Sequence, residues 1–117
     1  MASGFALMGI KVRHKFGAIR CESHGIKFPS KLERDCYDVL RKMQANGEIL
    51  FFLRQIGFDL PSCRHFVDFM VAHPDEIKFI EAKGRDLGIG KIKRNITEQI
   101  YNIKIEVITK PSQIMEL

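Results

Sequence analysis

The sequence predicts a mixed α/β domain in which a central mixed β-sheet is flanked by helices and preceded by an N-terminal β-hairpin. Two segments repeat apolar residues at helical spacing, and several others are rich in β-branched and aromatic residues. The 117 residues, 45% of them hydrophobic, are enough for one core and leave no room for a second domain. We therefore expect a single domain over residues 14–117 and an N-terminal tail over residues 1–13.

A hairpin and a helix are the first elements expected. Two β-favouring stretches, 18–22 and 26–28, surround a turn at 23–25. Residues 30–33 then have the S-x-x-E form that begins helices, and apolar residues recur after them at helical spacing. This helix should end near the Asn46-Gly47 pair, which is typical of helix C-termini.

Three consecutive strands should follow, because residues 49–60, 65–72 and 77–83 are rich in β-branched and aromatic residues and are separated by turn-forming segments. Residues 84–90 contain several glycines and predict a loop facing DNA. They lack the G-x-x-x-x-G-K-[ST] pattern of a phosphate-binding loop, and no small organic cofactor is expected.

A second helix is indicated by Ile92, Ile96, Ile100 and Ile103, which recur at helical spacing. Basic residues stand beside them, so the helix should have one apolar and one basic side. Residues 103–107 then alternate apolar and charged side chains, which predicts a half-buried strand that ends before Pro111.

The charge of +5 is unevenly distributed along the chain. Residues 1–31 carry six Lys/Arg against one acid, and residues 82–104 carry six against two. Residues 32–81 instead carry nine acids against six bases. This distribution suits a polyanion bound at the basic flanks and a cation bound at the acidic centre, although a solvated surface would explain the composition alone.

The cysteines and the apolar runs of the sequence indicate where in the cell the protein is expected. Cys21, Cys36 and Cys63 are odd in number and show no metal-ligand spacing, which favours reduced thiols and an intracellular protein. The apolar run Ile49–Leu53 is too short to span a bilayer, and residues 1–10 lack the preceding positive charges of a secretory signal. We expect a cytoplasmic protein with no membrane partner.

Charged residues that need an explanation stand on two of the expected strands. Glu81 and Lys83 share a strand face that begins with apolar residues, and Asp68 lies among apolar neighbours on the preceding strand. Burying such groups is unfavourable unless they are paired or hold a metal. If the strands pair, Asp68, Glu81 and the Ala82 carbonyl would offer hard oxygen ligands for Mg²⁺, with Lys83 beside the attacking water.

The two segments 66–69 (FVDF) and 79–84 (FIEAKG) resemble the paired motifs of the PD-(D/E)XK nuclease superfamily. In that superfamily an acidic residue on one strand is followed on the next by an E-x-K triplet. Val67 replaces the usual proline before the aspartate. The resemblance implies a restriction-endonuclease-like core and an endodeoxyribonuclease that depends on Mg²⁺, or on Mn²⁺ in its place, with Asp68, Glu81 and Lys83 catalytic.

The likeness extends from residue 14 to about residue 108 and covers small phage-encoded endodeoxyribonucleases and phage endonuclease I-type Holliday junction resolvases. Its further motifs are Lys15-Phe16-Gly17, Gly25-Ile26-Lys27-Phe28, Ser30-Lys31-Leu32-Glu33, Gly47-Glu48-Ile49 and Gln55. It implies that Glu33 is a further catalytic and metal ligand, that the substrate is branched DNA in the cytoplasm of a host cell, and that the protein is a homodimer, since a four-way junction needs two symmetric cuts.

Simpler interpretations compete with several of these assignments. An isolated E-x-K triplet is usually a surface ion pair, and Ser30 with Glu33 forms a complete capping box. His65 should point away from the face of Asp68, while His14, His24 and His73 fall in loops or turns. Gln55 either fills a sheet position near the site or is an exposed strand residue. The residues expected to contact DNA phosphates are Arg13, Lys15, Arg20, Lys31, Arg85, Lys91, Lys93 and Arg94.

Two rival functions stay open from the sequence. The first is a phage replication or recombination nickase or flap nuclease that has no preference for junctions. The second is a DNA-binding module on the same fold without catalysis. Retention of all four predicted site residues argues against the second.

Overall fold

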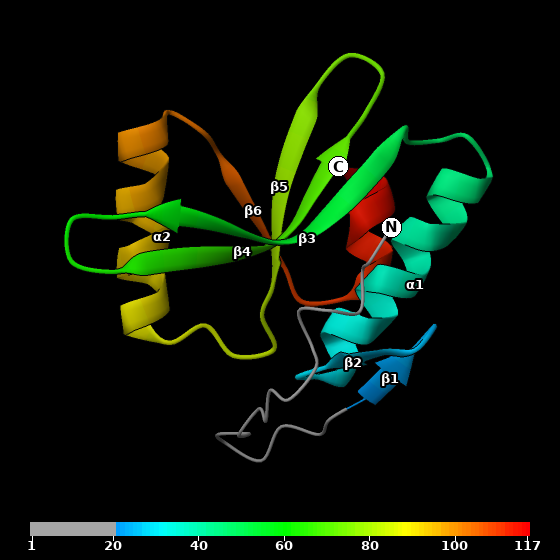
Figure 1. The fold of residues 1–117 in the computed structure, drawn as a ribbon, viewed down its shortest axis with the longest axis horizontal. Coiled ribbons are helices and arrows are strands. Elements are labelled where there is room, and N and C mark those ends of the chain that lie inside the picture. The colour runs from blue at the N-terminus through cyan, green and yellow to red at the C-terminus, as the bar shows by residue number, and fades with distance from the viewer. Residues whose placement is uncertain (1–20) are drawn as a thin grey trace.

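The computed structural model describes residues 21–117 and shows the mixed α/β architecture that the sequence predicts (Figure 1). Residues 1–13, with Arg13, and the predicted DNA contacts Lys15 and Arg20 lie outside the described residues. In chain order the elements are β1 (Cys21–Ser23), β2 (Ile26–Phe28), α1 (Lys31–Ala45), β3 (Phe51–Asp59), β4 (Arg64–Ala72), β5 (Ile77–Ala82), α2 (Gly88–Tyr101), β6 (Ile105–Ile108) and the 3₁₀ helix η2 (Pro111–Glu116).

Four strands form a mixed sheet in the order β3-β4-β5-β6. The pairs β3–β4 and β4–β5 are antiparallel, whereas β5 and β6 are parallel because the chain crosses over through α2. β1 and β2 form the separate N-terminal hairpin. The mixed sheet, the flanking helices and the hairpin confirm the predicted fold class.

One face of the sheet packs against α1 and η2. The apolar side of α1, with Cys36 and Leu40, meets Phe69 of β4 and Ile80 of β5 in the core, and Ile114 of η2 joins them. Ser30 caps α1 by accepting a hydrogen bond from the Glu33 N–H at 3.2 Å. η2 was not predicted, because its apolar residues follow Pro111, where the sequence indicated only the end of a strand.

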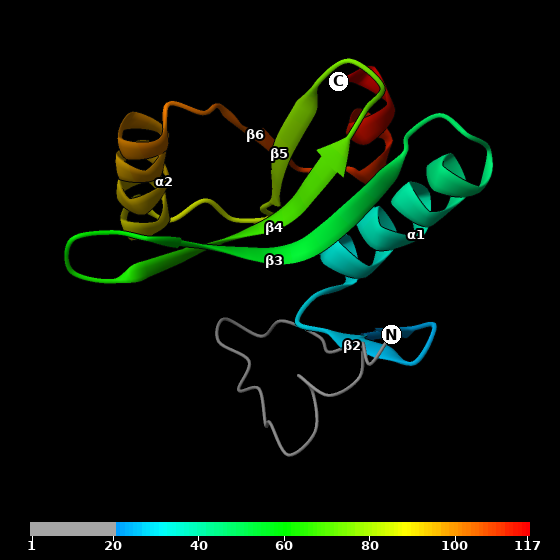
Figure 2. The same cartoon turned by 45° about the horizontal axis from the view of Figure 1, so that its top comes forward.

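The β3–β4 hairpin extends beyond the rest of the sheet to reach α2 (Figure 2). Gln55 interrupts β3 with a φ of 50°, and the register passes from Arg54↔Phe69 to Ile56↔Val67 without a pair at Gln55. Beyond this point the hairpin packs against α2, where the ring of Phe58 lies 4.9 Å from that of Tyr101. The backbone change at Gln55 therefore separates a part of the hairpin that packs on α1 from a part that packs on α2.

α2 differs from its prediction in two ways. It begins at Gly88, so the predicted loop 84–90 is shorter than expected. Its buried residues are Arg94 and Thr97, while Ile92 and Ile100 are exposed, so its apolar side does not face the sheet. The spacing of the isoleucines predicted the helix correctly, but it did not predict which side of the helix faces the sheet. Within residues 21–117, no helix combines the length and the apolar character needed to cross a membrane.

Candidate active site

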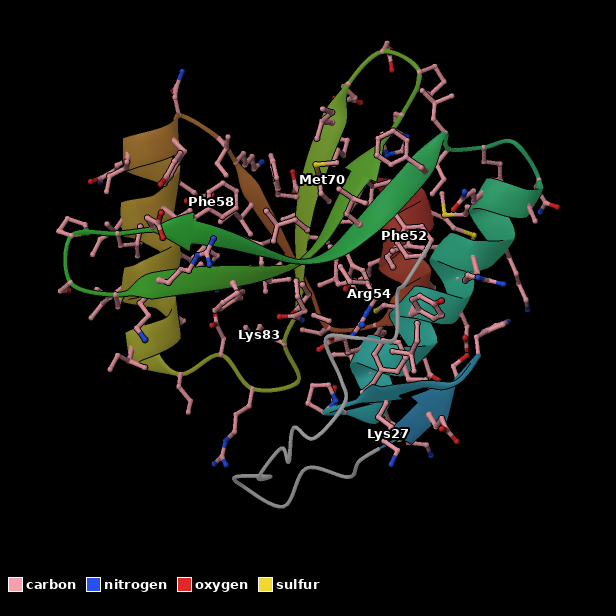
Figure 3. The ribbon with its side chains drawn as sticks, viewed as in Figure 1. Lys27, Phe52, Arg54, Phe58, Met70 and Lys83 are labelled. Atoms are coloured by element: carbon pink, nitrogen blue, oxygen red, sulfur yellow. The ribbon has the colours of Figure 1, made fainter. Side chains whose placement is uncertain are left out.

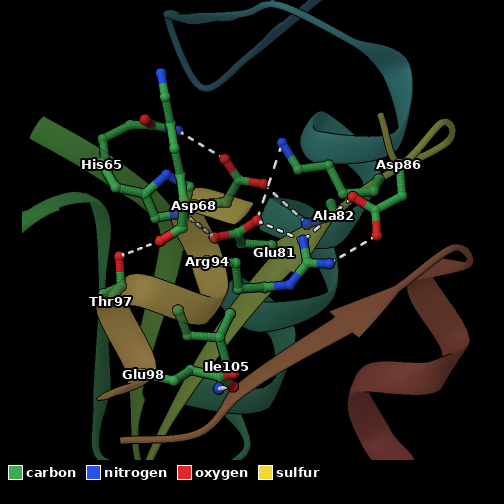
Figure 4. Close-up of polar contacts among 12 residues, drawn as sticks. His65, Asp68, Glu81, Ala82, Asp86, Arg94, Thr97, Glu98 and Ile105 are labelled. Carbon is green, nitrogen blue, oxygen red and sulfur yellow. Dashed lines mark hydrogen bonds and ion pairs between the residues drawn. The ribbon is translucent and has the colours of Figure 1, made fainter. Parts of the chain in front are cut away.

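The predicted acidic residues meet where β4 and β5 separate. The last pair of this ladder is Phe69↔Ile80, so Asp68 and Glu81 stand opposite each other one residue further on. Asp68 Oδ2 accepts a hydrogen bond from the Ala82 N–H at 2.8 Å, which replaces the next backbone contact of the ladder (Figure 4). The expected convergence of the two strands is thus present, and it is the N–H of Ala82 that contacts Asp68.

Gln55 joins Asp68 to a carboxylate from a distant part of the sequence. Its Nε2 donates to Asp68 Oδ1 at 3.1 Å and to Glu33 Oε2 at 3.0 Å. The left-handed backbone of Gln55, unusual for a residue other than glycine, accompanies this placement of its amide. Of the two sequence interpretations of Gln55, the structure supports the one near the site.

The side chain of Glu33 is directed to this cluster. Its backbone N–H donates to the Ser30 hydroxyl that caps the helix, but its carboxylate contacts Gln55 and Arg54 and is buried. The capping-box interpretation therefore explains the backbone of Glu33 and not its carboxylate. α1 contributes Glu33 from its first turn, β3 contributes Gln55, and β4 contributes Asp68.

Arg54 is a site residue that the sequence did not reveal. Its guanidinium lies 3.4 Å from Glu33 Oε2 and 4.3 Å from the centre of the Phe28 ring (Figure 3). Its buried Nε has no hydrogen-bond partner among the described residues. An arginine in the middle of a strand carries no local signal that it will reach a helix terminus, so only the tertiary structure identifies it.

The negative charges of Glu33 and Asp68 are only partly balanced by the neighbouring positive and hydrogen-bond-donating groups. Burial, and then the negative charge of Asp68, raise the pKa of Glu33 to about 7 against the lowering effect of Arg54 and Gln55. Burial also raises the pKa of Asp68, opposed by the Ala82 N–H and by the charge of Lys83. Gln55 brings the two acids together with a neutral amide, which leaves an excess of negative charge that a cation would relieve.

Glu81 has a different environment. It is fully buried, and its Oε2 lies 2.5 Å from His65 Nε2. Its Oε1 lies 3.4 Å from the Arg94 guanidinium and 4.0 Å from Lys83 Nζ. Three nitrogen-bearing side chains therefore surround this carboxylate. The predicted neighbourhood of Glu81 and Lys83 is present.

The contact with His65 corrects the expectation that this histidine points away from the site. Side chains do alternate along β4, so His65 and Asp68 leave opposite sides of the strand. However, β4 pairs with β5 only from Phe69 onward, and the preceding residues follow β3 through its break at Gln55. This part of the hairpin turns toward α2 and brings the imidazole against Glu81.

Arg94 was expected to contact DNA phosphates, and its position corrects that expectation. It is buried and donates to the Asp86 carboxylate at 2.7 and 3.2 Å as well as to Glu81. The hydrogen bonds of Arg94 hold the pKa of Asp86 below its usual value, and the pKa of Arg94 is raised in turn. Arg94 therefore ties α2 to β5 and to the loop between them.

The other described residues that were predicted to contact DNA differ in their exposure. Lys31, Arg85 and Lys91 are exposed, and Lys93 is half-buried. Lys31 is the first residue of α1, two positions before Glu33, and Arg85 lies two positions after Lys83. Two of the exposed cations thus flank the acidic cluster in sequence.

The cluster fits a divalent cation by its chemistry. Within residues 21–117, no three His, Cys, Asp or Glu side chains form a group that could enclose a metal ion. Mg²⁺ does not require such a group, because it commonly binds one or two carboxylates together with water and substrate phosphates. Glu33 and Asp68 supply two hard, incompletely neutralised carboxylates and therefore meet this requirement.

Comparisons with known proteins add little to this geometry. No protein-family model matches the chain, and no curated protein matches it. Among solved structures, the chain is similar to Can2 from Sulfobacillus thermosulfidooxidans, determined in complex with cyclic tetra-adenylate, with a TM-score of 0.45 and 16% identity. The likeness covers 82% of this chain and only 39% of that chain. A likeness at this level carries no argument about the function of this chain.

Proposed function

We propose that the protein is a metal-dependent endodeoxyribonuclease that hydrolyses phosphodiester bonds of DNA. The observation that carries the proposal is the meeting of Glu33, Gln55 and Asp68, which come from α1, β3 and β4, beside the Glu81–Lys83 pair of β5. Excess negative charge next to an ammonium group favours binding of a cation and a phosphate together.

Glu33 and Asp68 are the residues proposed to hold Mg²⁺, or Mn²⁺ in its place. Glu81 and the Ala82 carbonyl complete the predicted ligand set. The bound ion would polarise a phosphoryl oxygen and lower the pKa of water. Gln55 holds the two principal carboxylates beside each other through its two hydrogen bonds, and Arg54 limits their repulsion.

Lys83 is proposed to act on the phosphate and its nucleophile. Its Nζ is partly exposed and lies 4.0 Å from Glu81 Oε1, which restrains it beside the cluster. An ammonium there can orient the attacking water and offset charge on the phosphorane. In the reaction the water oxygen bonds to phosphorus, one phosphorus–oxygen bond to a sugar breaks, and the departing sugar oxygen takes up a proton.

The substrate is proposed to be DNA because the chain is basic and because exposed Lys31 and Arg85 lie close in sequence to site residues. Branched DNA is the more specific proposal, supported by the sequence resemblance to junction resolvases. Cutting a four-way junction in two symmetric places would require two copies of the site.

The test uses labelled linear, flap and four-way DNA, each incubated with the protein with and without Mg²⁺. We expect Mg²⁺-dependent cleavage, with the four-way junction cut fastest. Asp68→Asn should reduce cleavage at least about 100-fold, because even partners of metal ligands are typically worth 10- to 100-fold. Asp59→Asn is the matched control, since Asp59 is exposed at the end of β3, and it should leave cleavage unchanged.

The outcomes separate the alternatives. Equal cleavage of all three DNA forms would contradict junction selectivity and favour a nickase or flap nuclease. Binding of DNA without cleavage under any divalent cation would contradict the nuclease and favour a non-catalytic binding module. Cleavage by Asp68→Asn at the rate of Asp59→Asn would contradict the proposed site.

A further inference from the structure

The outer half of the β3–β4 hairpin presents an aromatic ring and a guanidinium to solvent. Phe66 of β4 is 50% exposed, although its neighbours His65 and Val67 are buried. The Arg64 guanidinium lies over the Phe66 ring, with its Cζ 5.6 Å from the ring centre. Arg64 also forms an ion pair with Asp59 at 3.2 Å, but both side chains are exposed, so this pair contributes little. We call Arg64 and Phe66 the hairpin platform.

A glycine in the facing strand makes room for this arrangement. Gly57 of β3 pairs with Phe66 of β4. A Cβ atom at position 57 would lie 2.6 Å from Arg64 Nε and 2.8 Å from Arg64 Cζ, closer than van der Waals contact allows. Gly57 lies inside β3 and its φ is not positive, so its backbone does not require glycine. A single exposed phenylalanine needs no explanation, but here the absence of a side chain at Gly57 allows Arg64 to lie across the hairpin beside the ring.

The hairpin platform is continuous with the acidic cluster. Side chains two apart on a strand leave the same face, so Arg64 and Phe66 share the face of β4 from which Asp68 leaves. At about 3.3 Å per residue, Phe66 is about 7 Å and Arg64 about 13 Å from Asp68 along the strand. The nucleotides of one DNA strand rise about 3.4 Å each. The Phe66 ring therefore lies about two nucleotides from a phosphate bound at Asp68. The hairpin extends beyond the rest of the sheet, so this face is open to a ligand (Figure 2).

We propose that the hairpin platform stacks on an unpaired base of the DNA strand bound at the acidic cluster. This inference rests on the proposed function, and it narrows the substrate to DNA with an unpaired base beside the cut. An exposed aromatic ring offers a stacking surface to any base, and the guanidinium adds a cation–π contact and a positive charge. Removing a base from a continuous duplex stack is costly, so the hairpin platform favours DNA in which the stack is already interrupted, such as a branch point.

Fluorescence anisotropy with labelled DNA tests the proposal without divalent cation, at about 50 mM salt, so that the result does not depend on cleavage. The probes are a fully paired duplex, the same duplex with one unpaired thymine, and the same duplex with an unpaired abasic site instead. The wild type should bind the duplex with the unpaired thymine most tightly. Phe66→Ala should weaken this binding at least about fivefold, because it removes one stacked base.

Two variants and one probe separate stacking from a loss of folding. Phe66→Tyr keeps the ring and should bind as the wild type does. Phe51→Ala, at an exposed phenylalanine at the other end of β3, is the matched control and should also bind normally. On the abasic duplex, Phe66→Ala and the wild type should agree within about twofold, because no base is present to stack. A folding defect would instead weaken binding to both duplexes equally.

Gly57→Ala tests the placement of Arg64. The added methyl group would meet the far end of a flexible side chain, so the variant should fold while the guanidinium is displaced. Its affinity for the duplex with the unpaired thymine should fall to about that of Arg64→Ala. The double variant should lose no more than Arg64→Ala alone, because both changes remove the same contact. Losses that add in the double variant would contradict the role given to Gly57.

The outcomes distinguish this inference from the proposed nuclease. Equal affinity of the wild type for the paired duplex and for the duplex with the unpaired thymine would overturn the inference. Equal binding by Phe66→Ala and Phe51→Ala would do the same and would leave the ring to another partner. In either case, cleavage that depends on Asp68 would still support the nuclease. Binding that depends on Phe66, without cleavage in Mg²⁺, would support the hairpin platform and contradict the nuclease.

Discussion

Glu33 and Asp68 differ from Glu81 in how their charge is compensated. Glu33 and Asp68 share the neutral amide of Gln55, and the pKa of each is raised. Glu81 is more deeply buried than either, yet it is surrounded by His65, Lys83 and Arg94. The first pair can still gain from a cation, whereas Glu81 already has nitrogen-bearing partners that hold it in place.

This difference separates two roles within one acidic cluster. Glu81 belongs to the E-x-K triplet and is the acid that the sequence identifies first. In the structure it connects β5 with α2 through Arg94, and with the hairpin through His65. We therefore assign the principal cation-binding role to Glu33 and Asp68, and a supporting role in the framework to Glu81.

The largest effect on stability is expected for Glu81→Gln. This change leaves Arg94 and His65 buried beside a neutral amide, and removing one partner of a buried ion pair typically costs about 3 kcal/mol or more. Because Asp86 still pairs with Arg94, we expect a loss of about 3 kcal/mol in the free energy of unfolding, measured by urea denaturation at pH 7. Glu76→Gln on the exposed β4–β5 turn is the control. A loss below about 0.5 kcal/mol, the usual limit for surface changes, would show that the surrounding cations do not depend on Glu81.

Glu33→Gln is expected to raise the free energy of unfolding rather than to lower it. The folded-state pKa of Glu33 is raised to about 7 from an ordinary value of 4.5, so the protonated form is favoured by folding. The stability that this group contributes is full below pH 4.5 and is lost as the pH rises through 7. A neutral glutamine avoids this loss. The variant should match the wild type near pH 4.5 and exceed it by up to about 3 kcal/mol at pH 8.

Thermal and urea unfolding at both pH values check this prediction, with Glu48→Gln, in the exposed loop that follows α1, as the control. Destabilisation by Glu33→Gln at pH 8 would mean that Arg54 and Gln55 already compensate the carboxylate, and the distinction from Glu81 would fail.

A smaller effect is expected at Gln55. Replacement by Ala or by Gly removes the same two hydrogen bonds, so the two variants differ only in how well they tolerate a φ of 50°. Glycine adopts this region freely, and other residues do so at a cost of about 1 kcal/mol. Gln55→Gly should therefore be the more stable of the two by about that amount in urea denaturation. The reverse order, usual inside a strand, would contradict a strained backbone at Gln55.

Much of the fold could be predicted because it depends on local patterns. The apolar side of α1 faces the core as its periodicity indicates, and Ser30 and Asn46 mark its ends. Three strands were predicted within a few residues because β-branched residues and turn signals are local. Asp68, Glu81 and Lys83 were found because charged residues on apolar strands are unusual.

The remainder depends on the path of the chain in three dimensions. The isoleucine pattern of α2 predicts a helix, but its inward side is selected by the carboxylates of Glu81 and Asp86, which attract Arg94. The contact between His65 and Glu81 follows from the break in β3 at Gln55, a residue type that does not signal a positive φ. Neither ion pairs between residues far apart in the sequence nor the positive φ of a single residue leaves a periodic pattern in the sequence.

The most direct test of the division between the two regions is calorimetric titration of the protein with Mg²⁺ in the absence of DNA at pH 8. The wild type and the control Asp59→Asn should bind Mg²⁺. Asp68→Asn should lose measurable binding, because it removes a carboxylate that Gln55 holds beside Glu33. Equal Mg²⁺ affinity of Asp68→Asn and Asp59→Asn would contradict the assignment of Glu33 and Asp68 as the cation-binding pair.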